Sequence, residues 1–243
     1  MSEWQDPCLP DGWRLKVLEE AGSTNDELRS CGDEANGLVL LAERQTAGRG
    51  RRGAAWLSAP GESLTFSVLL RPNEPKAFWP RLSLATGLAV AEALGRFGVE
   101  AQIKWPNDVL VRGRKICGIL VEAAAQHVIV GIGLNVGTRE FPDGLEATSM
   151  SLELGTPIER SDVLYQVLKS LVGWSGEIGS GFPDLLERVR ERCALSGESV
   201  SLMSGERSVS GVVSGIGEGG ELLVVTDDGE EKFLQAHEVR IRR

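Results

Sequence analysis

The chain contains no apolar run long enough to cross a bilayer, and its first 13 residues are acidic without an apolar core. We therefore expect neither a membrane span nor a signal peptide. Only two histidines, His127 and His237, are present, and the four cysteines are far apart without a Cys-x-x-Cys pair. A zinc site is not expected. A reducing cytoplasm is the simplest setting, with the cysteines as small buried hydrophobic residues.

Basic charge is also scarce, because 26 Lys and Arg residues stand against 35 Asp and Glu residues, a net charge of -9. A protein that binds nucleic acid in general needs a basic face, so this composition argues against that class. The length of 243 residues is enough for one full domain and one small domain.

Positive charge is nevertheless concentrated in one segment, Glu43 to Trp56, which we call the arginine loop. Its sequence, ERQTAGRGRRGAAW, interleaves Arg49, Arg51 and Arg52 with Gly48, Gly50 and Gly53. Glycine lets a ligand approach the backbone closely, and arginine presents a planar fork of donors to phosphate or carboxylate. The segment therefore predicts a flexible loop that closes over an anion.

The three glycines also satisfy the G-x-G-x-x-G pattern of dinucleotide-binding proteins. That pattern requires a strand directly before it and a helix directly after it. Here Glu43–Ala47 separates the glycines from the apolar run at residues 38–42, and the chain that follows breaks at Pro60-Gly61 and then alternates like a strand. No Gly-Lys-Ser/Thr sequence follows either, so we reject both a Rossmann site and a P-loop.

Periodicity elsewhere predicts an α+β protein. We expect strands over residues 38–43, 63–70, 102–105, 109–111, 116–122 and 128–136, and helices after residue 25, over 78–97 and within 148–195. Residues 63–70 alternate apolar with polar, which is typical of a half-buried strand. Short strands with Gly-rich or acidic turns follow Leu195, so the predicted domains are residues 1–195 and 196–243, the second a small β-barrel.

Four segments carry polar residues or glycines where core packing does not require them. They are Ser23–Asn25, Gln45 with the loop glycines, Lys104–Asp108 with Lys115, and Gly131–Asn135. Together they suit a substrate with a neutral polar head and a carboxylate tail, beside a nucleotide phosphate. Purely structural roles are the alternative for two of these segments. Ser23–Asn25 could serve only as a helix cap, and Gly131 and Gly133 could form a β-bulge instead of a pocket wall.

The motifs STN, QTAGRGRRG, KWPND, RKICGILVE and GIGLN, in this order, resemble those of biotin protein ligases over about residues 15–240. The resemblance implies a mixed β-sheet flanked by helices, like that of class II synthetases, followed by an SH3-like β-barrel. It also implies that ATP and Mg²⁺ activate biotin to biotinyl-5′-AMP. The biotinyl group then passes to a lysine of the carrier domain of a biotin-dependent carboxylase, such as acetyl-CoA carboxylase.

The same resemblance assigns roles to residues of the predicted pocket. Ser23, Thr24 and Gln45 would hold the ureido ring of biotin, with Asn25 beside them. Arg49, Gly50 and Arg51, with Gly48 before them in the arginine loop, would close over the biotin tail and the α-phosphate. Lys115 would pair with the biotin carboxylate and then with the adenylate. Trp56 would flank the adenine, and the nucleotide side would be lined by Asn107, Asp108 and Asn135.

Several assignments keep an alternative. Lys104 contacts phosphate or is a surface lysine, Asp108 caps a turn or helps to place Mg²⁺, and Trp105 is favoured as a core residue. About twenty residues precede Ser23, too few for the DNA-binding domain of some family members, so we expect a ligase that does not bind DNA. A lipoate ligase-like enzyme and a non-catalytic biotin sensor are the rival functions, and self-association is left open.

Overall fold

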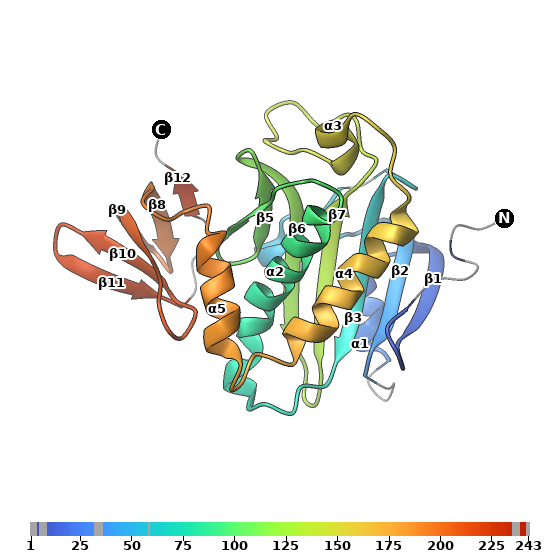
Figure 1. Cartoon of the computed structure of the whole chain (residues 1–243), viewed down its shortest axis with the longest axis horizontal. Helices are drawn as coiled ribbons and strands as arrows, with labels where there is room; N and C mark the ends of the chain where they lie inside the picture. Colours follow the sequence, from blue (N-terminus) through green and yellow to red (C-terminus); the bar gives the residue numbers. More distant parts are fainter. Residues whose placement is uncertain (1–3, 5–8, 32–35, 58, 235–238, 242–243) are drawn as a thin grey trace.

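A computed structural model describes residues 4, 9–31, 36–57, 59–234 and 239–241, and it describes only the backbone of Arg52. The chain forms two sheets (Figure 1). The first has seven strands in the order β1-β2-β3-β7-β6-β5-β4, and the second has five in the order β11-β10-β9-β8-β12. The predicted α+β fold with a mixed sheet is confirmed.

The first sheet contains β1 (Arg14–Ala21), β2 (Leu38–Gln45), β3 (Ser63–Leu70), β4 (Gln102–Lys104), β5 (Asp108–Val111), β6 (Arg114–Ala123) and β7 (Val128–Asn135). β1 and β2 run parallel and are connected through α1 (Thr24–Arg29), and the other pairs are antiparallel. The predicted hairpin is β5–β6. Arg112 and Gly113 both have positive φ in its turn, 50° and 77°, which matches the twist of a tight hairpin.

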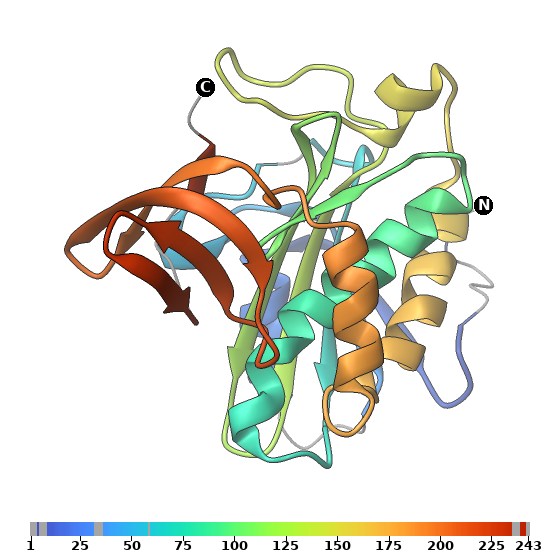
Figure 2. The same ribbon diagram turned by 60° about the vertical axis from the view of Figure 1, so that its left-hand side comes forward.

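The long helices cover one face of this sheet and α1 lies against the other (Figures 1 and 2). The covering helices are α2 (Leu82–Gly95), α4 (Arg160–Ser175) and α5 (Phe182–Glu191), and the short α3 (Met150–Leu154) precedes α4. α2 is apolar around most of its circumference because the sheet and α4 enclose it. The helix predicted over 78–97 is wrong at its start, because residues Lys76–Arg81 form a 3₁₀ helix containing Pro80, which has no N–H to donate.

The prediction that residues 63–70 form a half-buried strand is also wrong, because every residue of β3 is buried. Leu64, Phe66 and Val68 belong to the hydrophobic core. The three alternating polar residues are buried too, and each makes a hydrogen bond: Ser63 with Thr138, Thr65 with the carbonyl of Ala42, and Ser67 with Thr24. The alternation therefore separates an apolar buried face from a polar buried face.

The second sheet contains β8 (Ser199–Ser204), β9 (Arg207–Ile216), β10 (Leu222–Thr226), β11 (Gly229–Phe233) and β12 (Val239–Ile241). It is antiparallel and SH3-like in size, as predicted, but in the described residues it is open and does not close into a barrel. The indole Nε1 of Trp105 donates to the carbonyl of Gly220 at 3.0 Å and so connects the two sheets. The domain division at residue 195 stays a prediction.

The cysteine prediction holds only in part. Cys31, Cys117 and Cys193 are free thiols, but only Cys117 is fully buried, and Cys8 and His237 lie outside the described residues. Within the described ranges, no helix has the length and apolar character needed to span a membrane.

Candidate active site

A cavity of about 260 Å³ lies where the arginine loop meets strands β6 and β7 and the start of α1. Most of the predicted site residues line it: Ser23, Thr24, Asn25, Gln45, Arg49, Gly50, Arg51, Trp56, Lys104, Asn107, Asp108 and Lys115. The other two, Gly48 and Asn135, line a neighbouring cavity of about 460 Å³. We call these the first and the second cavity. The four motif segments therefore meet in space.

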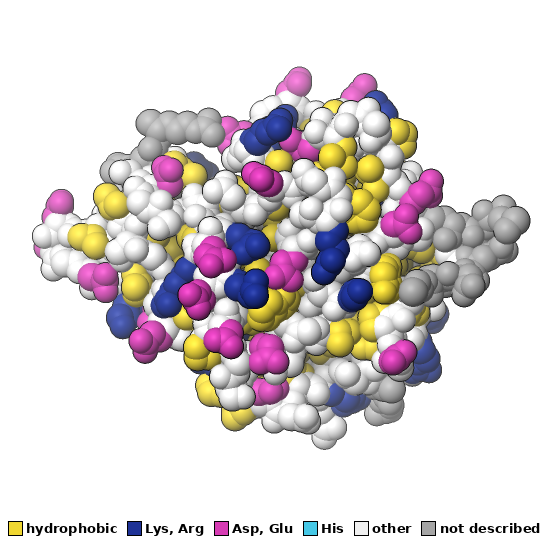
Figure 3. All heavy atoms as spheres, viewed as in Figure 1, with side chains coloured by type: hydrophobic (Ala, Val, Ile, Leu, Met, Phe, Trp, Pro, Cys, Tyr) yellow, Lys and Arg dark blue, Asp and Glu magenta, His cyan; other side chains and the backbone are white. Residues whose placement is uncertain are grey.

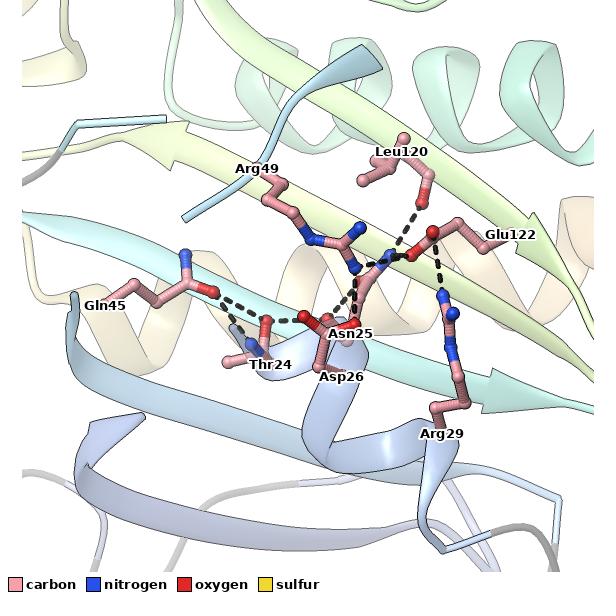
Figure 4. A network of polar contacts seen from close by, with 9 residues as sticks. Thr24, Asn25, Asp26, Arg29, Gln45, Arg49, Leu120 and Glu122 are labelled. Atoms are coloured by element: carbon pink, nitrogen blue, oxygen red, sulfur yellow. Dashed lines mark hydrogen bonds and ion pairs between the residues drawn. The ribbon is translucent and has the colours of Figure 1, made fainter. Parts of the chain in front are cut away.

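One end of the first cavity is a buried row of neutral polar groups (Figure 4). Ser23 occupies the N-cap position of α1, but its side chain makes no capping hydrogen bond, so the interpretation as a cap alone is wrong. The backbone N–H of Thr24 donates to Gln45 Oε1 at 2.8 Å, and its hydroxyl lies 3.2 Å from the same oxygen. Ser67 Oγ lies 2.7 Å from Thr24 Oγ1. These bonds fix the row before any ligand enters.

Asn25 packs directly against the backbone of β7. Its Oδ1 lies 2.6 Å from Ser67 Oγ, and its Nδ2 donates to Glu122 Oε2 at 2.7 Å. A Cβ on Gly131 would lie 3.0 Å from Asn25 Cγ and closer still to Oδ1, which real side chains do not tolerate. β7 pairs with β3 and β6 without a register shift, so the bulge is excluded. The absence of a Cβ lets Asn25 approach, and Gly131 and Gly133 both line the first cavity, so the interpretation as a pocket wall is confirmed.

Trp56 makes the same use of Gly133, where an added Cβ would collide with its indole ring. The ring lines both cavities, and Lys115 Nζ lies 5.7 Å from its centroid. Its Nε1 is buried and has no hydrogen-bond partner among the described residues, which is unusual for a buried donor. Trp56 and Lys115 thus mark the junction of the two cavities.

The first cavity is locally positive. Among the described lining residues the cations are Arg49, Arg51, Lys104 and Lys115, against the single carboxylate of Asp108. By contrast, the outward face of the helical layer shows acidic and basic side chains interspersed (Figure 3). In a chain with a net charge of -9, a concave surface with this excess of cations attracts an anionic ligand.

Three of these cations, Lys115, Arg49 and Arg51, are held in place by other side chains. Lys115 Nζ is 2.7 Å from Asp108 Oδ1, and Arg49 Nη2 is 2.5 Å from Asp26 Oδ1. Asn107 is fixed by donating to the carbonyl of Ile119 at 3.0 Å, and it accepts from Arg51 Nη1 at 3.1 Å. An anion that enters therefore finds donors already oriented, and it competes with protein carboxylates for two of them.

The base of the arginine loop is anchored at Glu43, near the end of β2. Its carboxylate accepts from Arg160 Nη1 at 2.8 Å and Nη2 at 3.1 Å, and from Trp4 Nε1 at 2.6 Å. Burial raises the pKa of Glu43, but the hydrogen bonds from Arg160 and Trp4 outweigh it and leave the pKa below its usual value. The loop thus starts from a fixed, ionised residue.

No described residue of the site is poised as a nucleophile. Burial raises the pKa of the Cys117 thiol, Asp108 raises it further and Lys115 opposes both, so the thiol stays protonated. His127 does not line the first cavity, and burial together with Arg71 lowers its pKa. Cys117 fits the structural role that we expected of the cysteines. The site is built to orient anions and to stabilise their charge.

Sequence reasoning missed three residues that hold this site together. Asp26, in the first turn of α1, and Glu122, within a motif, had no site role assigned to them, and Ser67 was expected on the polar face of a half-buried strand. A serine in the middle of a central strand was the available signal. No sequence signal indicated that Asp26 and Glu122 would meet Arg49.

Comparison with known proteins gives consistent matches. A profile of the Biotin/lipoate A/B protein ligase family matches residues 17–135. The Biotin--[acetyl-CoA-carboxylase] ligase of Mycobacterium tuberculosis is 36% identical over 224 residues, which cover 88% of this chain and 84% of that protein. The Bifunctional ligase/repressor BirA of Bacillus subtilis is 34% identical over 232 residues, covering 90% of this chain and 71% of that protein.

Solved structures agree with the sequence matches. Biotin protein ligase from Aquifex aeolicus, solved in complex with biotin and ATP, superposes with a TM-score of 0.86 at 35% identity. The match covers 94% of this chain and 99% of the other. The similarity therefore extends over both sheets.

Proposed function

The chain belongs to the biotin protein ligases of the Biotin/lipoate A/B protein ligase family, and from that premise we propose a two-step reaction with a carboxylase carrier domain as acceptor. In the first step, a carboxylate oxygen of biotin attacks the α-phosphorus of ATP, giving biotinyl-5′-AMP and pyrophosphate. In the second, the neutral amine of the acceptor lysine attacks the biotinyl carbonyl, and AMP leaves. Neither step needs a protein nucleophile.

The observation that carries this proposal is the meeting of the two cavities at Trp56 and Lys115. The first cavity offers a neutral polar end, which suits a ureido ring held by Ser23, Thr24 and Gln45, with Asn25 beside them. The second would take the adenosine, with Trp56 against the base and Asn135 and Gly48 in its wall. The two substrates would then meet at the cationic junction.

At that junction, Lys115, Arg49 and Arg51 are proposed as the groups that bring two anions together. A carboxylate and a triphosphate repel each other, and fixed cations offset that repulsion. They also stabilise the negative charge that grows on the α-phosphate and on the departing pyrophosphate. Gly50 lets the loop backbone come close, and loop closure would shield the mixed anhydride from water.

Asp108, Asn107 and Lys104 are proposed to serve the phosphate side. Mg²⁺ is commonly held by one or two carboxylates together with substrate phosphates and water. Asp108 is the one carboxylate among the described lining residues of the first cavity, so it is the residue that would help to hold an ion arriving with ATP, and Asn107 Nδ2 orients it by donating to its Oδ1 at 3.3 Å. Such an ion would neutralise phosphate charge.

The proposal is tested by incubating the protein with ATP, Mg²⁺, biotin and a purified carboxylase carrier domain, and by measuring the carrier's intact mass. We expect a gain of one biotinyl group. A carrier with the acceptor lysine replaced by arginine, and a reaction without ATP, are the controls. A gain with lipoate alone would support the rival ligase. Biotin binding without any gain would support a sensor.

A further inference from the structure

The carboxylate of Glu122, on β6, contacts Asn25 and Arg49, two residues that line the first cavity (Figure 4). Its Oε2 accepts from Asn25 Nδ2 at 2.7 Å and lies 3.4 Å from Arg49 Nη2. Its Oε1 is 2.8 Å from Arg29 Nη2. One side chain therefore touches the neutral polar row, the arginine loop and the end of α1.

Arg49 is held from two directions. Its Nη2 lies 2.5 Å from Asp26 Oδ1 as well as 3.4 Å from Glu122 Oε2. Both contacts use the same nitrogen, and no other hydrogen bond or ion pair of Arg49 occurs among the described residues. Nη1 and Nε therefore remain for a ligand anion while Nη2 stays on the carboxylates.

The charge distribution explains why these carboxylates matter. Before a substrate anion arrives, Arg49 lines the same cavity as Arg51, Lys104 and Lys115, and like charges repel. Asp26 and Glu122 offset that repulsion at the tip of the loop. The Glu122 side chain is 22% exposed and that of Asp26 is 53% exposed, so solvent screens Glu122 less.

We propose that Glu122, assisted by Asp26, is a positioning residue that couples the buried Asn25 to Arg49 of the arginine loop. A ligand that contacts Asn25 then further stabilises the carboxylate that holds Arg49 beside the cavity. The proposed effect of biotin on the arginine loop rests on the function proposed above. The proposed effect of Glu122 on that loop in the ligand-free protein does not.

Hydrogen exchange in the ligand-free protein tests the hold on the loop. The reporters are two amides within the loop: Gly50 N–H, bonded to the Ala54 carbonyl at 2.6 Å, and Trp56 N–H, bonded to the Gly48 carbonyl at 2.9 Å. Glu122→Gln keeps the shape and removes the charge, and we expect both amides to exchange about 3-fold faster. Asp26→Asn should give a smaller increase.

Glu231→Gln is the matched control. Glu231, on β11, pairs with Arg207, on β9, at 2.8 Å, and neither residue belongs to the arginine loop or lines the first cavity. Exchange in the loop should not change in this variant. Because Glu122 acts through Arg49, adding Glu122→Gln to Arg49→Gln should change loop exchange no further. Melting temperatures of all variants show whether each remains folded.

Biotin without ATP then tests the coupling. Biotin should slow loop exchange in the wild type, and Glu122→Gln should reduce that effect and raise the KM for biotin more than it lowers kcat. Wild-type exchange rates in Glu122→Gln, with and without biotin, would overturn the inference while leaving the ligase assignment intact. If the wild type fails to bind biotin by calorimetry, the proposed function fails, and the ligand-free exchange rates still decide the role of Glu122.

Discussion

Replacing Gly131 by alanine should weaken biotin binding through a residue that need not touch the ligand. The new Cβ would lie 3.0 Å from Asn25 Cγ and nearer to Oδ1. Because Gly131 is in the middle of β7 and paired on both sides, the backbone has little room to move. Asn25 must therefore retreat by about 1 Å to reach ordinary contact distance.

That displacement stretches two short hydrogen bonds at once. Asn25 is 3% exposed, and its bonds to Ser67 and Glu122 are 2.6 Å and 2.7 Å long. A buried polar group that loses its partner costs about 1–3 kcal/mol. We therefore expect the affinity for biotin to fall by about 10- to 100-fold, and the melting temperature to fall by several degrees.

Calorimetric titration with biotin, without ATP, measures the affinity, and thermal unfolding measures the stability. Gly87→Ala is the matched control, because Gly87 is also buried but its Cβ would meet Ile103 at an ordinary 3.5 Å. Alanine is preferred over glycine in a helix by about 0.8–1.0 kcal/mol, so this variant should be as stable as the wild type or more stable, with unchanged affinity.

The reasoning would be refuted if Gly131→Ala bound biotin as tightly as Gly87→Ala and melted at the wild-type temperature. Asn25 would then have an alternative position of equal energy, and the close contact with β7 would not matter. Lower stability with unchanged affinity would mean that Asn25 serves the fold and not the ligand.

Three further predictions concern other parts of the molecule. Lys115→Ala should slow biotin-dependent ATP–pyrophosphate exchange by about 100-fold or more, and it should lower the melting temperature less than a substitution in the core does. Lys169→Ala, at an exposed position, is the control and should change neither quantity. Unchanged pyrophosphate exchange in Lys115→Ala would contradict the role proposed for Lys115. Glu43→Gln should lower the free energy of unfolding, measured with urea, at pH 7. The loss should become smaller as the pH falls below about 4.5 and through the lowered pKa of Glu43, because the wild-type carboxylate is then protonated too. A loss that does not depend on pH would argue against an ionised, hydrogen-bonded Glu43. Trp105→Phe should lower the free energy of unfolding by about 1 kcal/mol by removing the bond to Gly220, and equal stability would refute that estimate.

The sequence was informative about which segments form the site, because each motif carries residues that a packed core does not need. Gly131 and Gly133 in a strand, and the glycines among arginines in the loop, indicated close approach before the partner was known. The partner could not be predicted from the sequence. Asn25 and Gly131 are distant along the chain, and only the parallel β1–α1–β2 crossover and the order of strands bring them together.

The remaining errors share one cause, which is that a local pattern does not reveal what covers it. The alternation of polar and apolar residues in β3 would be the same whether its polar face contacted water or, as it does, the buried side chains of Thr24 and Asn25. Pro80 lies within an apolar stretch of helical period, so the pattern did not show that the α-helix begins only at Leu82. The meeting of Arg49 with Glu122 depends on how the loop folds over β6, which no periodicity encodes.

The bond from Trp105 to Gly220 has a practical consequence for anyone who shortens the chain. Val239, on the last strand, lines the first cavity, and Trp105 lines it while donating to the second sheet. A fragment ending near residue 195 would therefore lack part of the wall of the first cavity and would leave Trp105 Nε1 without its acceptor, the carbonyl of Gly220. The small sheet thus contributes to that wall, and its removal would expose the first cavity on one side.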